Sequence, residues 1–378
     1  MSSAMQRSAA IGAGALLLAG VACSSGGKSN GSGGAASSAA TASSGSAAGS
    51  TCGSAAGGSG AGSGAASSAS SGAGVGGGAA GMDCATSPCI NVTNNCPFPL
   101  WIHAQDNQGD TLAPDDAMIE AAPKPGSTIQ YAVPASWPAG RVNAYWVDPN
   151  GPSPDPTAFE KVEVTVGNGA MNYNITYVDY AALPSRMEAV GPSCQKTSTF
   201  DPTVSCDQPV IGFIANCPMG LRSGQRCLSA GLFCSMSQNT GSAFCHALDA
   251  QIAACVQQNP STCGIAAQLG NGTPQVYGCS GYFDGQQPSG CTMPSTTCHV
   301  DGNEWCAALN RGMLAQPTST EATQYYTTPP YNTYAQWVHA TCPGIYAFPY
   351  DDYPSGAGQS GFRSCTADRL DITFCPAG

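Results

Sequence analysis

The sequence predicts a mainly β protein, an antiparallel sandwich or barrel that carries a disulfide-rich lobe of loops and short helices. Three observations support this fold class. Before residue 200, short segments that alternate polar with β-branched or aromatic residues are separated by Pro and Gly, without a helical period. Of the 20 cysteines, 18 lie between Cys84 and Cys375. Charged residues make up only 9% of the chain, so Ser, Thr, Asn, Gln and Gly must form much of the surface.

Residues 1–23 have the pattern of an export signal. The segment contains an arginine and an apolar run, and Ala22 precedes Cys23, which resembles a bacterial lipoprotein signal. Gly20 stands where such signals usually have Leu, so ordinary secretion after cleavage near Ala22 is the alternative. The apolar run is too short to span a bilayer. We expect a secreted protein or a cell-envelope lipoprotein, linked to a membrane only through a lipid on Cys23.

Residues 24–81 consist almost entirely of Ser, Gly, Ala and Thr. Such a segment cannot bury enough apolar surface to offset the entropy lost on ordering, so we expect a flexible tether. Cys52 within it has no obvious partner. The folded domain is therefore expected to span residues 82–378, with a cysteine-rich insertion at about 194–310.

Several alternating segments predict the strands of this domain. Residues 90–104 alternate on both sides of Cys96 and Pro97, which predicts two strands that meet at a bend. Further strands are expected at residues 128–133 and 141–147.

The longest alternating stretch, from Lys161 to Pro184, predicts two strands joined by a turn at residues 167–169. This places Glu163 and Asp179 on two connected strands. Glycoside hydrolysis needs two rigidly held carboxyl groups, since one protonates the leaving oxygen while the other activates water or attacks the anomeric carbon. The alternative is that both groups only solvate the sheet.

Twelve of the cysteines lie between Cys194 and residue 310. A loop-rich lobe without a large core needs cross-links, each of which stabilises it by about 2–4 kcal/mol. Short helices are expected at residues 244–256 and 331–342, the second with Tyr334, Trp337 and Val338 on a face that packs into the core.

The cysteine content and the export signal together indicate an oxidising compartment. A zinc cluster is the alternative use of these cysteines, but no Cys-x-x-Cys pair occurs between Cys206 and Cys306. We therefore expect disulfides, with no metal and no cofactor.

The formal net charge of −11 argues against a nucleic-acid partner, because the chain could not neutralise a phosphate backbone. Neutral polymers, cationic surfaces and carbohydrates remain as partners.

Five segments, in order, are similar to segments of thaumatin-like proteins. They are Asn-Asn-Cys-Pro-Phe-Pro-Leu-Trp at 94–101, Ser-Trp-Pro-Ala-Gly-Arg at 136–141, the stretch 173–184, the stretch 342–352, and Asp-Ile-Thr-Phe-Cys-Pro at 371–376. The chain thus resembles the thaumatin-like (osmotin or pathogenesis-related) superfamily, with which the laminaripentaose-producing β-1,3-glucanases are grouped. The resemblance implies a thaumatin-like antiparallel β-sandwich with a disulfide-rich lobe of loops and short helices.

Proteins of this family carry an acidic cleft between the sandwich and the lobe, and some act on β-1,3-glucans. The resemblance places Glu163 on the cleft glutamate and Asp179 on the aspartate of a Leu-Val-Asp motif. The interval between them matches that of the catalytic pair in the related glucanases. It therefore implies an inverting endo-β-1,3-glucanase with Glu163 as the acid and Asp179 as the base.

The resemblance also implies residues that bind the substrate. Arg141 lies on the strand of the cleft arginine, and Asp351 or Asp352 falls on an acidic pair. The chain departs from the family at Asn174, where the family has an aspartate. Because an amide does not titrate, the cleft is expected to be less acidic.

Aromatic residues at strand positions are candidates for stacking on sugar rings, although such residues more often belong to the core. The candidates are Trp101, Tyr145, Trp146, Tyr177 and Tyr180.

The resemblance implies two disulfides, Cys96 with Cys375 and Cys342 with Cys365. Cys84 and Cys89 either close a small loop or pair elsewhere, and spacing does not determine the remaining connectivity.

We expect a monomer, secreted or surface-anchored, that binds β-1,3-glucan or a related cell-wall polysaccharide and, in the enzyme interpretation, hydrolyses it. A non-catalytic carbohydrate or cell-surface binding module is the first alternative. A cell-envelope structural or antagonistic protein without glucan affinity is the second.

Overall fold

The computed structural model describes residue 84 and residues 88–120, 128–258, 276–279, 302–329, 331–354 and 361–376. All of them belong to the compact unit of residues 71–378. The expected export signal and tether, with Cys23 and Cys52, lie outside the described residues, as does part of the expected insertion at 194–310. Within the described ranges, no helix combines the length and the apolar character needed to cross a membrane.

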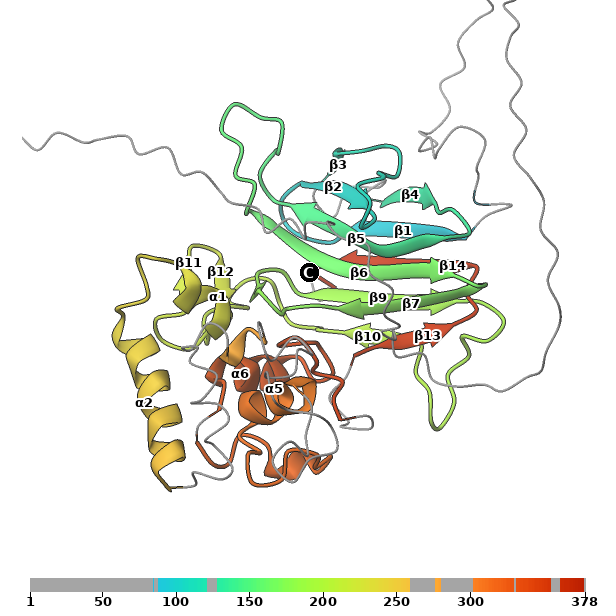
Figure 1. Ribbon diagram of the computed structural model, residues 1–378. Helices are drawn as coiled ribbons and strands as arrows, with labels where there is room; N and C mark the ends of the chain where they lie inside the picture. The colour runs from blue at the N-terminus through green and yellow to red at the C-terminus, as the bar shows by residue number, and fades with distance from the viewer. Residues whose placement is uncertain are drawn as a thin grey trace, which may run out of the picture. The chain divides into compact units, whose positions relative to one another are not determined.

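Two large sheets form the main body of this unit, and the prediction of a mainly β fold is confirmed (Figure 1). The six-stranded sheet has the order β13 (Arg363–Cys365), β7 (Ala170–Ile175), β6 (Phe159–Gly167), β5 (Trp137–Tyr145), β2 (Leu100–Gln105), β3 (Ala117–Ile119). The five-stranded sheet has the order β10 (Thr203–Ser205), β9 (Ser185–Val190), β14 (Arg369–Phe374), β1 (Cys89–Asn94), β4 (Thr128–Ala132).

Strand β6 shows how the alternating sequence builds the sheet. Val162, Val164 and Val166 are buried, whereas Lys161 and Glu163 point to the other, partly exposed face. The valines join one hydrophobic core with residues of the second sheet, because each strand buries the face on which its apolar residues recur.

The first and last described strands lie side by side. β1 pairs with β14 in parallel, from Cys89 opposite Arg369 to Asn94 opposite Phe374. All other strand pairs of the two large sheets are antiparallel in the described part of the chain. The expectation of an antiparallel sandwich therefore holds apart from this one pair.

A smaller lobe contains a three-stranded sheet and the helices, which Figure 1 shows grouped beside the strands. Its sheet is β11 (Arg222–Ser223), β12 (Arg226–Leu228), β8 (Tyr180–Ala181), and its helices are α1 (Ala230–Ser235), α2 (Ala243–Gln258), α5 (Gly302–Arg311), η2 (Ala322–Gln324) and α6 (Thr333–Thr341). Helices α2 and α6 confirm the two predicted helices. In α6, Tyr334, Trp337 and Val338 are buried as expected.

Seven disulfides join described cysteines. Two of them confirm expectations, Cys96–Cys375 and the small loop Cys84–Cys89. The remaining pairs are Cys194–Cys365, Cys206–Cys342, Cys217–Cys227, Cys234–Cys245 and Cys279–Cys306.

The expected disulfide Cys342–Cys365 is wrong. Cys365 lies on β13 and pairs with Cys194, while Cys342 ends helix α6 and pairs with Cys206 beyond β10. Cys365 of β13 is thus joined to the segment around Cys194, and Cys342 at the end of α6 is joined to the residue that follows β10.

Candidate active site

Polar side chains form a row across the outer face of the six-stranded sheet. The strand register pairs Arg141 on β5 with Glu163 on β6, and Glu163 with Asn174 on β7. On the other side of Arg141 lies Gln105 of β2. Directly opposite residues of antiparallel strands share one face, and neighbouring strands lie about 4.8 Å apart. The structure therefore brings together Arg141, Glu163 and Asn174, which the sequence had singled out.

A pocket on this face opens over Glu163. Its lining includes Arg141, Glu163, Thr165, Asn172, Asn174 and, at one side, Phe362. The polar side chains of this lining can exchange hydrogen bonds with a hydroxyl-rich ligand laid across the strands.

Asp179 reaches the same face from a bend and not from a strand. β7 ends at Ile175 and β8 begins at Tyr180, so the expected placement of Asp179 on a strand is wrong. Lys161 Nζ lies 2.6 Å from Asp179 Oδ2. Lys161 precedes Glu163 by two residues on the same face of β6, so the Cα atoms of Lys161 and Glu163 are about 7 Å apart. Lys161 thus holds the Asp179 carboxylate next to the row that contains Glu163.

The bend that carries Asp179 is fixed by contacts with distant parts of the chain. The Tyr177 N–H donates to the Tyr346 carbonyl over 2.8 Å, and the Ser229 N–H donates to the Asp179 carbonyl over 2.8 Å. These bonds draw the chain away from β6 after Ile175.

Glu160 lies on the opposite, buried face of β6 and fixes the segment that follows Asp179. Its carboxylate accepts the backbone N–H groups of Ala182 (2.7 Å), Leu183 (3.1 Å) and Lys161 (3.0 Å). Burial raises the pKa of Glu160 to about 8, and these N–H donors offset only part of that rise.

Two amide oxygens on the pocket face have no hydrogen-bond partner among the described residues. They are the buried Oδ1 atoms of Asn174 and Asn143, and Asn143 lies opposite Lys161 in the sheet. A buried acceptor left unpaired costs about 1–3 kcal/mol. Of these two residues, Asn174 lines the pocket, although its Oδ1 atom is covered by neighbouring groups.

Tyr177 does not bind a ligand at the surface, which corrects the expectation for this residue. It is fully buried, its hydroxyl donates to the Leu183 carbonyl over 2.8 Å, and its pKa is raised well above the ordinary value by burial. Its backbone carbonyl accepts the Tyr334 hydroxyl of helix α6 at 2.5 Å, so α6 covers this position.

The other candidate aromatic residues differ in exposure. Tyr180 is buried in a small cluster with Leu228, with its ring 5.9 Å from that of Phe159. Trp101 and Tyr145 lie opposite each other, half-buried, on the pocket face. Trp146 is half-buried and packs against the core, so only Trp101 and Tyr145 of this set remain candidates for sugar contact.

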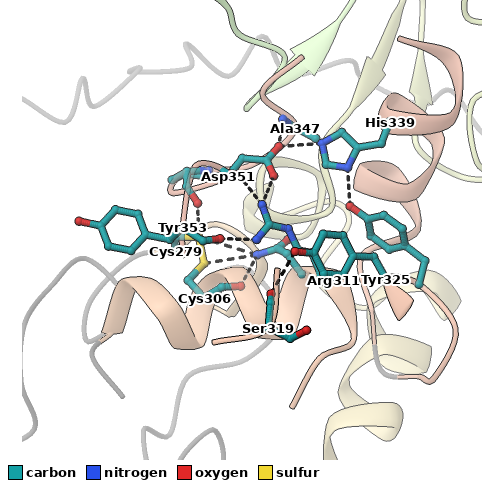
Figure 2. Close-up of polar contacts among 12 residues, drawn as sticks. Cys279, Cys306, Arg311, Ser319, Tyr325, His339, Ala347, Asp351 and Tyr353 are labelled. Atoms are coloured by element: carbon teal, nitrogen blue, oxygen red, sulfur yellow. Dashed lines mark hydrogen bonds and ion pairs between the residues drawn. A yellow bond between two sulfur atoms is a disulfide. The ribbon is translucent and has the colours of Figure 1, made fainter. Parts of the chain in front are cut away.

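Asp351 is a buried residue of the helical lobe, which corrects its expected role in substrate binding. Figure 2 shows its carboxylate between Arg311, His339 and Ala347. Arg311 Nη2 lies 2.8 Å from Oδ1, His339 Nε2 lies 2.7 Å from Oδ2, and the Ala347 N–H donates to Oδ2 over 2.9 Å. Asp351 is 0% exposed. Of the two alternatives in the sequence, the exposed Asp352 remains the candidate.

Arg311 extends this network to the backbone. Its guanidinium donates to the carbonyls of Asp351 and Tyr353 and lies over the rings of Tyr325 (4.9 Å) and Phe348 (5.3 Å). The end of α5 is thereby tied to the segment that leads to Asp352.

A histidine and two carboxylates meet at the β2 side of the sheet. His103 Nδ1 lies 2.5 Å from Asp115 Oδ1 and 3.4 Å from Asp116 Oδ1, and the Asn150 amide donates to Asp116 over 2.8 Å. The three ligand atoms lie within 4.8 Å of one another, close enough for a metal ion. The contacts among these three side chains account for the arrangement by themselves, and no cofactor follows from it.

Lys161 and Phe362 are among the residues of the pocket face that the sequence analysis did not predict for the site. Lys161 could have been found, because it shares the alternation phase of Glu163 on β6. Phe362 gave no such signal, since it follows a Gly-rich segment without alternation.

The fold and the face together define a class: a disulfide-stabilised β-sandwich with a helical lobe and a carboxyl-lined sheet face. Residues 242–372 match the model of glycoside hydrolase family 64, which is described as β-1,3-glucanase. The match begins one residue before α2 and ends within β14. Glu163 and Asp179 precede the matched residues. A search of curated proteins gave no significant match.

Solved structures agree on the fold. A β-1,3-glucanase domain from Clostridium beijerinckii is 17% identical, with 78% of this chain and 100% of that domain covered, at a TM-score of 0.54. A laminaripentaose-producing β-1,3-glucanase in complex with laminaritetraose is 17% identical, with 76% of this chain and 98% of that one covered, at a TM-score of 0.51.

The expected likeness to thaumatin-like proteins is supported only in part. A thaumatin-like xylanase inhibitor matches 26% of this chain at a TM-score of 0.18, which is too little to support an argument. The chain has the fold of β-1,3-glucanase domains, and this fold and the family match are consistent with a glycoside hydrolase of the endo-β-1,3-glucanase type.

Proposed function

We propose that this protein binds β-1,3-glucan along the pocket face and hydrolyses it with Glu163 and Asp179. The observation that carries the proposal is the arrangement of these two carboxyl groups. Glu163 lies in the polar row across β5, β6 and β7, and Lys161 of the same strand holds Asp179 beside that row. The family match and the relatives that act on β-1,3-glucan support the choice of substrate.

The reaction proposed is hydrolysis with inversion. Glu163 donates its proton to the glycosidic oxygen as the bond from that oxygen to the anomeric carbon breaks. Asp179 takes a proton from a water molecule, whose oxygen attacks the anomeric carbon from the opposite side. Lys161 keeps the Asp179 carboxylate in position, while Arg141, Asn174 and Asp352 bind substrate hydroxyls.

The test is hydrolysis of laminarin, a soluble β-1,3-glucan, by the purified full chain, by Glu163→Gln and by Asp179→Asn. We expect reducing ends from the wild type and a loss of at least a hundredfold in each variant, because each removes one of two groups that act together. NMR of the first product should show the anomeric configuration opposite to that of the substrate. No product from the wild type, or equal product from all three proteins, would exclude the proposal that Glu163 and Asp179 hydrolyse β-1,3-glucan.

A second candidate function is binding without hydrolysis. It is favoured by Asp179, whose carboxylate is engaged by Lys161 at 2.6 Å, and by Asn174, which cannot carry charge. In that case the wild type would co-sediment with insoluble β-1,3-glucan and release no soluble sugar.

We also propose that the chain is exported as a monomer and is either secreted or anchored through a lipid on Cys23. The residue pattern before Cys23 supports export. Labelling with a radioactive fatty acid should mark the wild type but not Cys23→Ala. Equal labelling of both would exclude the anchor, and size-exclusion chromatography would test the monomer.

A further inference from the structure

Phe362 continues the row of residues that contains Glu163. Strand β13 pairs with β7 so that Arg363 lies opposite Tyr173 and Ser364 opposite Asn172. One residue earlier, the same antiparallel register places Phe362 opposite Asn174, which faces Glu163. Phe362 therefore stands two strand spacings from Glu163, about 10 Å away.

The ring of Phe362 is exposed, but the backbone that carries it is closely packed. The residue is 47% exposed and is the single aromatic residue among the exposed large apolar side chains of the described ranges. A Cβ on the preceding Gly361 would come within 1.9 Å of the Gly344 carbonyl oxygen, so this position accepts only glycine.

Strand β13 adds further anchors next to the ring. Arg363 Nε donates to the Asp201 carbonyl over 2.8 Å, and Arg363 Nη1 donates to the Phe362 carbonyl over 3.0 Å. An exposed aromatic ring on a fixed backbone binds a ligand with little further loss of conformational entropy.

Phe362 has hydrogen-bonding side chains on both sides, which are the kind of groups that bind sugar hydroxyls. Asn174, which carries a side-chain amide, lines the same pocket as Phe362. On the other side of the ring, a second hollow is lined by Phe362, Ser364 and the hydroxyl residues 197–199. Phe362 thus stands where two polar hollows meet, with hydrogen-bonding groups on both sides.

We propose that Phe362 forms a distal sugar subsite, in which its ring stacks on the apolar C–H face of a glucosyl unit while the side-chain amide of Asn174, which lines the same pocket, forms a hydrogen bond with a sugar hydroxyl. An aromatic ring flanked by amide and hydroxyl groups matches the two surfaces of a pyranose, one apolar and one polar. The subsite lies on the side of β7 and β13, so the glucan chain runs across the strands from Glu163 toward the second hollow. The inference rests on the proposed function, because it extends the same binding face.

The test measures binding of laminarihexaose by calorimetry to the full chain, with Glu163→Gln in every protein so that the ligand is not cleaved. We expect Phe362→Ala to weaken binding about tenfold, which corresponds to about 1.4 kcal/mol. Phe362→Tyr keeps the flat ring and should stay within about twofold of the parent. Phe362→Leu keeps apolar volume without the ring and should resemble Phe362→Ala.

Ile211→Ala is the matched control, because Ile211 is an exposed apolar residue (84% exposed) that lines neither hollow. It should bind like the parent. Melting temperatures of all variants should agree with the parent, since the Phe362 ring is exposed. With an otherwise wild-type chain, Phe362→Ala should raise KM for laminarin and leave kcat nearly unchanged.

The outcomes separate this inference from the proposed function. If the parent binds laminarihexaose and Phe362→Ala binds equally well, the subsite is excluded while the proposed function stands. If Phe362→Leu binds like the parent, stacking is excluded. If the parent binds no β-1,3-glucan, the proposed function fails first, and the subsite fails with it.

Discussion

Two adjacent residues of β6 position the proposed base from opposite faces of the sheet. Lys161 lies on the pocket face and forms an ion pair with the side chain of Asp179. Glu160 points into the core and holds the backbone of Ala182 and Leu183, directly after the bend. The location of Asp179 therefore depends on this strand more than on its own local sequence.

Removing the Lys161 ammonium should lower catalysis and leave stability nearly unchanged. In Lys161→Gln, we expect hydrolysis of laminarin to fall roughly ten- to hundredfold, because Asp179 loses the group that positions it. Since Asp179 is 49% exposed, the free energy of unfolding should change by less than about 1 kcal/mol. Steady-state kinetics and urea denaturation measure the two quantities.

Arg369→Gln is the control for this prediction. It removes an ion pair of the other large sheet, Arg369 with Asp371 at 2.8 Å, and it should leave hydrolysis unchanged. A Lys161→Gln protein with full activity would show that the ion pair does not position the base.

Glu160 should make stability depend on pH. Its pKa is raised to about 8 in the folded state, while the unfolded chain titrates near the ordinary value of 4.5. Between these values the unfolded chain has released the proton that the folded chain still holds. The free energy of unfolding should therefore fall as the pH rises from about 5 to 8, by on the order of 1 kcal/mol per pH unit, with no such cost below pH 4.5.

Urea denaturation at several pH values checks this, with Glu160→Gln as the comparison. The variant cannot titrate, so its stability should fall less steeply over the same interval. Parallel curves for the two proteins would show that Glu160 keeps an ordinary pKa in the folded chain.

At the scale of elements, contacts with the helical lobe determine where strand β7 ends and which of the residues after it are buried. Helix α6 covers Tyr177 through the Tyr334 hydroxyl, and β7 ends where Thr176 forms a bridge with Tyr346. The network of Arg311, Asp351 and His339 joins α5, α6 and the segment 346–354.

Breaking this network should unfold the lobe more easily. Asp351→Asn leaves the Arg311 charge buried, at 1% exposure, without a carboxylate partner, so we expect a loss of about 3–5 kcal/mol. Asp352→Asn changes the exposed neighbouring carboxylate and should alter stability by no more than about 0.5 kcal/mol. Thermal denaturation of both variants measures the difference, and equal stability would contradict a structural role for Asp351.

The same elements show which parts of the structure local sequence can predict. The alternation with a period of two in residues 161–166 predicts a strand and predicts that Glu163 points away from the core. Both predictions follow because one face of the strand is apolar and must be buried. The bend at Asp179 is not predictable in this way. The alternation that starts at Tyr173 shifts phase at Val178 and Asp179, but the partners that end the strand lie far along the chain at Ser229 and Tyr346.

Residues of the site were predicted or missed for similar reasons. Glu163, Arg141 and Asn174 were found on strands and share one row, while their roles in binding or catalysis remain predictions. Asp351 and Tyr177 were misplaced because distant helices bury them. Phe362 belongs to the face only through the pairing of β13 with β7, which no local pattern reveals.

At the scale of the molecule, disulfides tie together segments that are remote in sequence. Cys96–Cys375 joins residues 279 positions apart next to the parallel pair of β1 and β14, and Cys206–Cys342 and Cys194–Cys365 link the strands with later segments. The resemblance of the segments around Cys96 and Cys375 to thaumatin-like proteins implied the first pairing, which the structure confirms. The other two pairings, of which Cys206–Cys342 is nested within Cys194–Cys365, were not predictable, since spacing alone permits many connectivities.

Removing Cys96–Cys375 should destabilise the protein more than removing a local disulfide. With Cys194–Cys365 intact, the first bond still closes a loop on the order of 100 residues in the unfolded chain, so the double variant to Ala should lose about 4–5 kcal/mol. Cys217–Cys227 closes a loop of separation 10 and should cost about 2–3 kcal/mol. Denaturation under non-reducing conditions compares them, and an equal cost would contradict the loop-length argument.

The bond between Cys96 and Cys375 also governs what a protease can do to this chain. A single cut at any peptide bond between the two cysteines leaves Cys96 on one fragment and Cys375 on the other, so the fragments stay covalently joined. A nicked molecule would keep its mass in the absence of a reductant, and β1 and β14 would remain linked beside each other. Loss of backbone continuity in the long middle of the chain therefore need not release any part of the enzyme proposed here.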